Sequence, residues 1–178
     1  TLSPKAKTIS RTAETFFSVA LYLAFIFHLA GYCLRWYIGG RIPLSNGYET
    51  MQFMALCILL IACLLHRRFP FILPFGFLLS GFALLVSYLG QMNPQITPLM
   101  PVLVSPWLSI HVSLIMMSYA LLAFIMLNGI LALCLRKKES ENNVSGNDAI
   151  QDNRIEQLTL VSRLLLYPAT FFLGAGIF

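Results

Sequence analysis

The chain of 178 residues is 58% hydrophobic and only 11% charged, and its mean hydropathy is +0.77. A soluble domain carries about 25% charged residues, so this composition excludes an ordinary soluble protein and indicates an integral membrane protein. The net charge of +5 is compatible with nucleic acid or with membrane lipid as a partner. Because the basic residues flank apolar segments, lipid is expected and nucleic acid is not.

Four apolar segments are predicted to cross a membrane as helices, which takes roughly 20 residues each. They lie at 15–37, 50–65, 69–90 and 107–135. The predicted fold is therefore all-α, a polytopic transmembrane helix bundle whose four complete spans occupy 15–135. Two loops, 38–49 and the proline-rich 91–106, join spans at one end of this bundle.

After the fourth span, a polar segment (136–154) is predicted to be a flexible aqueous loop. Within 155–178, apolar residues at 155, 158, 161 and 165 have the spacing of an amphipathic helix that lies in the membrane interface. From Leu164 onward about 15 residues reach roughly 22 Å, less than the hydrocarbon core of about 30 Å. The sequence thus predicts an interfacial helix, then a truncated fifth span, and a chain that is a fragment of a longer protein.

The orientation follows from the distribution of lysine and arginine. If the spans alternate, ten basic residues fall on one side and only Arg35 and Arg41 on the other. Basic residues are enriched on the cytoplasmic side of membrane proteins. Segments 1–14 and 136–154 are therefore predicted to be cytoplasmic, and the loops 38–49 and 91–106 to face outward.

His111 and Trp107 stand one helical turn apart at the start of the fourth span, on one face of the helix. Counting back about 20 residues from Arg136 places His111 at the outer membrane interface. A neutral histidine there can offer a ring nitrogen to a metal while its aromatic neighbour covers the site. The alternative is an interfacial histidine with no ligand.

Three further side chains are candidates for the binding of a cofactor. His28 lies inside the first span, where an ionisable residue usually faces a bundle interior; it has either a binding role or a hydrogen bond to a neighbouring helix. Arg35 and Arg41 face outward against the charge bias, and guanidinium groups match carboxylates. They could equally pair with Glu49 or with lipid phosphate.

These residues lie within motifs that resemble a known family. The stretches "RWYIGGRIPLSNGYET" (35–50) and "LMPVLVSPWLSIHVSLIMMSYALLAF" (99–124) resemble the cytochrome c assembly family, the haem-handling proteins of the system II cytochrome c synthase. The resemblance implies a bacterial inner-membrane protein that takes haem b across the membrane and presents it outside. It also implies attachment of the haem vinyl groups to the CxxCH thiols of apocytochrome c, with a second assembly subunit or a fused domain as partner.

His111 matches the first of two outward histidines that ligate the haem iron in that family. The tryptophan-rich segment and the second outward histidine are expected beyond Phe178. The full-length protein is therefore expected to act as a cytochrome c synthase, and the fragment alone to be inactive. The competing hypothesis is a non-enzymatic transporter or scaffold bundle with a fortuitous motif match.

Overall fold

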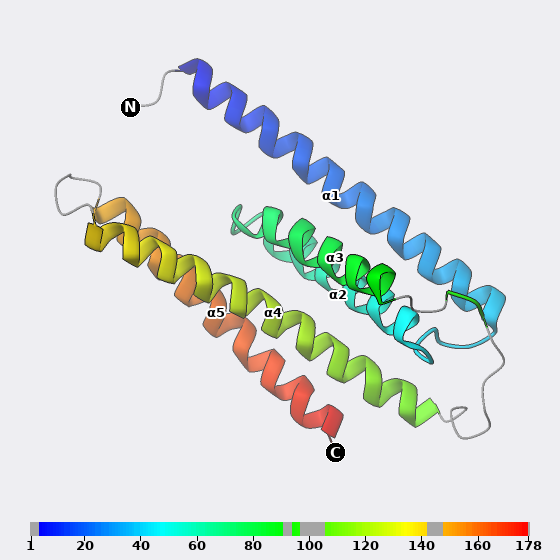
Figure 1. Ribbon diagram of the computed structural model, residues 1–178. Coiled ribbons are helices and arrows are strands. Elements are labelled where there is room, and N and C mark those ends of the chain that lie inside the picture. Colours follow the sequence, from blue (N-terminus) through cyan, green and yellow to red (C-terminus); the bar gives the residue numbers. More distant parts are fainter. Residues whose placement is uncertain (1–3, 91–93, 97–105, 142–147, 178) are drawn as a thin grey trace. The chain divides into compact units, whose positions relative to one another are not determined.

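The computed structural model describes residues 4–90, 94–96, 106–141 and 148–177. They contain five helices and no strand, as Figure 1 shows. The helices are α1 (Pro4–Gly39), α2 (Gly47–Leu65), α3 (Ile72–Leu89), α4 (Pro106–Glu141) and α5 (Asp148–Ile177). Each is long and apolar enough over part of its length to cross a membrane. The prediction of an all-α, polytopic membrane fold is confirmed.

The end of the chain differs in detail from the expectation. The structure has one continuous helix, α5, in which Asn153–Ile177 is long and apolar enough for a span, and not an interfacial helix followed by a short span. At about 1.5 Å per residue, those 25 residues reach roughly 37 Å. The predicted loop 136–154 is also shorter, because α4 extends into it to Glu141 and α5 begins at Asp148. Most of the predicted loop 91–106 lies outside the described residues.

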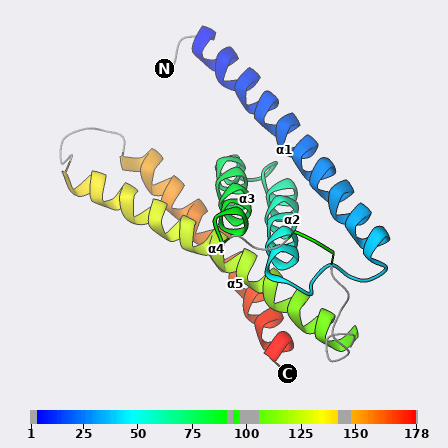
Figure 2. The same ribbon diagram turned by 45° about the vertical axis from the view of Figure 1, so that its right-hand side comes forward.

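The chain divides into two units, Thr1–Ser113 and Leu114–Phe178, and α4 crosses the boundary between them. In the first unit, α2 and α3 pack side by side and antiparallel, and α1 lies beside them (Figures 1 and 2). The core of this unit is formed by small and branched residues of α2, among them Ala55, Ile58 and Ala62, all fully buried.

The three helices of the first unit approach one another most closely around Gly76 of α3. A Cβ atom placed on Gly76 would lie 2.5 Å from the Cβ of Ala62 in α2 and 3.7 Å from Leu21 Cδ1 in α1. Small residues permit such backbone approach, and packing of this kind holds membrane helices together where lipid tails remove the hydrophobic driving force.

The second unit is an antiparallel pair formed by α4 and α5. Ser118 Oγ in α4 donates a hydrogen bond of 2.8 Å to the carbonyl oxygen of Ala169 in α5. Gly176 allows a second close approach, since a Cβ atom there would lie 2.8 Å from Ile115 Cγ1. The apolar stripe of α5 is buried at Leu158, Val161 and Ala169, so it forms a helix contact.

Candidate functional site

The link between α1 and α2 is shaped by local backbone signals. Gly40 has a positive φ of 62°, the left-handed conformation with which helices commonly end, and it terminates α1. Asn46 is the N-cap of α2, and its side chain accepts a hydrogen bond of 2.8 Å from the backbone N–H of Glu49. These two signals fix where the link begins and ends, and they place Glu49 in the first turn of α2.

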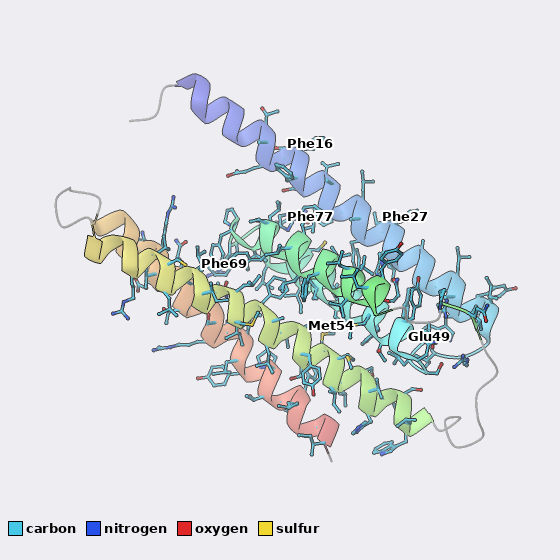
Figure 3. The ribbon with its side chains drawn as sticks, viewed as in Figure 1. Phe16, Phe27, Glu49, Met54, Phe69 and Phe77 are labelled. Atoms are coloured by element: carbon cyan, nitrogen blue, oxygen red, sulfur yellow. The ribbon has the colours of Figure 1, made fainter. Side chains whose placement is uncertain are left out.

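Glu49 is the centre of the polar network in this link. Its side chain is buried, with 2% exposure, at the end of α2 that Figure 3 labels. Oε1 accepts from Arg35 at 3.1 Å and lies 3.9 Å from Arg41 Nη2. Oε2 accepts from the backbone N–H of Ser45 at 2.9 Å and from its hydroxyl at 2.6 Å. Arg41 also donates to Ser45 Oγ. A buried carboxylate is therefore neutralised and hydrogen-bonded on both oxygens.

Arg35 connects this network to the segment after α3. Its Nη1 donates to the carbonyl oxygen of Pro94 at 2.7 Å, and its Nη2 lies 3.5 Å from that of Gln95. The guanidinium carbon also lies 5.1 Å from the ring centre of Tyr48, a cation–π distance. Arg35 thus joins α1, the first turn of α2 and residues 94–95.

His28 lies on the same face of α1, seven residues before Arg35, and bonds to the neighbouring helix. Its Nε2 lies 2.9 Å from the backbone oxygen of Gln52 in α2. A carbonyl oxygen only accepts, so Nε2 carries the hydrogen and the Nδ1 of the neutral ring keeps a free lone pair. A histidine that ligates a metal commonly has its other nitrogen fixed in this way.

A cleft of about 330 Å³ brings these predicted residues together. His28, Tyr32 and Arg35 of α1 line it with Tyr48 and Gln52 of α2. A neighbouring cleft of about 790 Å³ shares Tyr48 and Gln52 and extends toward residue 94. Both hydrophobic and hydrogen-bonding groups line the first cleft, so it can receive the polar edge of a largely apolar molecule.

His111 and Trp107 lie in the first turns of α4, with Trp107 71% exposed and His111 half-buried. Within the described residues, the His111 ring makes no hydrogen bond, so both ring nitrogens are open to a partner. No cluster of three or more potential metal ligands occurs in those residues either. A metal there would therefore be held by one or two side chains, with its other ligands supplied by a cofactor that carries it.

In the structure, therefore, Arg35 and Arg41 both lie beside the carboxylate of Glu49. Arg35 and His28 line the same cleft. The contributions of Ser45, Asn46 and Tyr48 were not predicted. Of these, Asn46 had a signal in the sequence, because an Asn followed three residues later by Glu is the signature of a capped helix start.

Comparison with known proteins gives the family. Residues 44–178 match the family described as Cytochrome C assembly protein. The chain is 32% identical over 166 residues to Protein NrfI of Wolinella succinogenes, covering 93% of this chain and 18% of that protein. It is 32% identical over 151 residues to the cytochrome c biogenesis protein CcsA of Chlamydomonas reinhardtii, covering 81% and 41%, respectively.

A third relative, CcsA of Synechococcus sp. (strain WH7803), is 40% identical over 95 residues, which are 50% of this chain and 29% of that protein. The chain thus spans less than half the length of each of these relatives. The match to the family covers the end of the first motif, from residue 44 on, and the whole of the second motif at the start of α4. This chain belongs to the cytochrome c assembly protein family.

Proposed function

We propose that this chain is the part of a cytochrome c biogenesis protein that holds haem at the outer end of the bundle for attachment to apocytochrome c. The main support is that Trp107 and His111 share one face at the start of α4 and that, among the described residues, none is hydrogen-bonded to the His111 ring. In this proposal His111 would hold haem b through a ring nitrogen bound to its iron, and Trp107 would shield the ligated ring.

The residues fit this group chemically. A neutral imidazole supplies one nitrogen lone pair, and an exposed indole one turn away supplies a flat apolar surface for a macrocycle. Axial ligation controls the position and potential of a haem iron. When bound, the haem supplies the vinyl groups that react with the two thiols of a CxxCH motif.

Arg35 and Arg41 are proposed to attract the haem propionates. Two guanidinium groups share the single carboxylate of Glu49, so the link keeps a net charge of +1 for an anion. Arg35 also donates to the carbonyl oxygen of Pro94 and lies 3.5 Å from that of Gln95, so it has a structural role beside the proposed one. His28 is proposed as a further cofactor-binding residue, through the Nδ1 that its bond to Gln52 leaves free.

The proposed setting is a bacterial inner membrane, with the N-terminus cytoplasmic and the link facing outward, as the ten-to-two distribution of basic residues predicts. The proposed partners are haem, apocytochrome c and a second assembly subunit or fused domain. The proposed activity of the full-length protein is that of a cytochrome c synthase. The alternative of a fortuitous motif match is not favoured, because the family match extends from 44 to 178.

The test replaces His111 by glycine in the full-length protein. Cytochrome product is expected to fall sharply, the haem absorption spectrum of the purified protein to change, and added imidazole to restore both by entering the vacated volume. Ser113→Gly is the control, because it introduces a glycine into the same helix without removing a nitrogen ligand. An unchanged haem spectrum in His111→Gly would show that His111 is not a ligand.

A further inference from the structure

A third cleft lies at the opposite end of the first unit, where α2 turns into α3. It measures about 1030 Å³, near the upper end of the range for small-molecule sites. Its walls come from residues 13–18 of α1, residues 66–70 of the turn and residues 73–78 of α3. Phe17, Leu73, Phe77 and Leu78 make the walls apolar, and Figure 3 labels Phe77 on α3.

His66 offers this cleft a hydrogen-bond acceptor. The side chain lines the cleft and the residue is only 8% exposed. Its Nδ1 lies 3.0 Å from the carbonyl oxygen of Cys63, so Nδ1 carries the hydrogen, and the Tyr22 ring packs edge-on at 5.2 Å. Nε2 is then an acceptor, and no described residue donates to it. This acceptor on the wall of the cleft is available to a ligand that brings a hydroxyl.

The charges at the rim favour an anion. Arg67 lines the cleft and Arg68 follows it, both exposed, and the lining contains one acid, Glu14 of α1. Within the described residues the ion pairs are those of Glu49, so Arg67 forms none. This end of α2 and α3 is also where their membrane-spanning stretches end and begin, at Leu65 and Ile72. The cleft therefore lies at the depth of lipid headgroups.

We propose that this cleft binds an anionic glycerophospholipid with a free headgroup hydroxyl, of the chemistry of phosphatidylglycerol. Acyl chain packs against Phe77 and the other apolar walls, the phosphate pairs with Arg67, and a glycerol hydroxyl donates to His66 Nε2. Basic pockets between membrane helices bind anionic headgroups in this manner. The site is independent of haem binding and of which membrane face this end occupies.

The experiment uses the full-length protein in nanodiscs that contain a photoreactive phosphatidylglycerol or, for comparison, a photoreactive phosphatidylcholine. Crosslinks of the phosphatidylglycerol are expected on residues 73–78. Arg67→Gln is expected to reduce them about fivefold, the factor for the ~1 kcal/mol that a basic residue contributes at an anionic surface. His66→Leu should reduce the preference for phosphatidylglycerol over an analogue whose two glycerol headgroup hydroxyls are methylated, and Glu14→Gln should increase crosslinking.

Arg136→Gln is the matched control, because it removes one exposed basic charge from α4, outside the cleft. The proposal is overturned if phosphatidylcholine crosslinks equally, or if Arg67→Gln and Arg136→Gln have the same effect. It is also overturned if the purified protein shows a haem absorption band that His66→Leu removes, since the cleft would then hold a metal porphyrin.

Discussion

Glu49 Oε1 accepts a hydrogen bond from Arg35 at 3.1 Å, and this contact joins α2 to α1 at one end of the first unit. The acid comes from the first turn of α2 and the base from α1, fourteen residues earlier. Because Arg41 lies near the same oxygen, two positive charges surround the single negative charge of the carboxylate.

Replacing Glu49 by glutamine should destabilise this end strongly. The amide keeps the size of the side chain but leaves two guanidinium groups without a counter-charge, and breaking a buried pair costs about 3 kcal/mol. The measurement is the midpoint of denaturant unfolding of the purified protein. Glu156→Gln on the exposed face of α5 is the control and should change it little. Equal midpoints for the two variants would contradict the central role of Glu49.

Arg41→Gln should separate binding from folding. Arg41 donates to Ser45 and lies near Glu49 within its own link, whereas Arg35 also reaches Pro94 beyond α3. We therefore expect Arg41→Gln to lower haem per protein with little change in membrane level, and Arg35→Gln to lower the level itself. Haem is measured by absorption and protein by immunoblot. If both variants lose protein and keep haem per protein, the arginines serve folding alone.

His28 can be tested with two variants that divide its nitrogens. His28→Gln supplies an N–H donor that can reach the Gln52 carbonyl but no imidazole nitrogen, whereas His28→Leu removes both. If His28 binds the cofactor, both variants should lose haem from the purified protein. Should glutamine preserve haem and stability while leucine loses them, the role of His28 is the interhelical hydrogen bond.

Gly76→Ala should loosen the first unit. The new methyl group would lie 2.5 Å from Ala62 Cβ, and neither atom can rotate away, so α2 and α3 must separate. Overpacking of this kind costs about 1–3 kcal/mol. Gly81→Ala, on the same helix with no atom within 4 Å, should be neutral or stabilising. Thermal stability in detergent measures both, and a Gly76→Ala protein as stable as Gly81→Ala would exclude the close approach.

The orientation is testable by reporter fusion. A phosphatase fused after Asn93 should be active, because the predicted outward loop exports it, and one fused after Ser145 should be inactive. The ten-to-two charge distribution is the basis of this expectation. The reverse pattern would place the link and His111 on the cytoplasmic side and remove the basis for delivery outside.

Hydropathy was sufficient to predict the helices, because each span must satisfy its own backbone and is therefore a long apolar run. It was not sufficient for α5. The spacing of Leu158, Val161 and Leu165 predicts one apolar stripe, but a stripe that contacts lipid headgroups and one that contacts α4 have the same sequence pattern. The bond from Ser118 to Ala169, the close approach of Gly176 to Ile115 and the burial of the stripe identify the contact with α4.

The candidate site was predictable in its residue types and not in its pairing. Two arginines and one acid in a short link indicate an ion pair, and the alternative of pairing with Glu49 was open from the sequence. The engagement of Arg35 by Pro94 had no signal, because a backbone carbonyl can belong to any residue. The partner of His28 was unpredictable for the same reason.

The reach of Arg35 to Pro94 has a consequence for biosynthesis. The two residues are 59 positions apart in the chain. At a synthesis rate of about 5–20 residues per second, Pro94 is therefore made roughly 3–12 seconds after Arg35. Glu49 is made only fourteen residues after Arg35 and can hold the guanidinium during the interval. The helices α1 and α2 can therefore enter the membrane as a hairpin in which Arg35 and Glu49 neutralise each other. The bond from Arg35 to Pro94 forms only after α3 has been inserted and residue 94 has reached the same end of the unit.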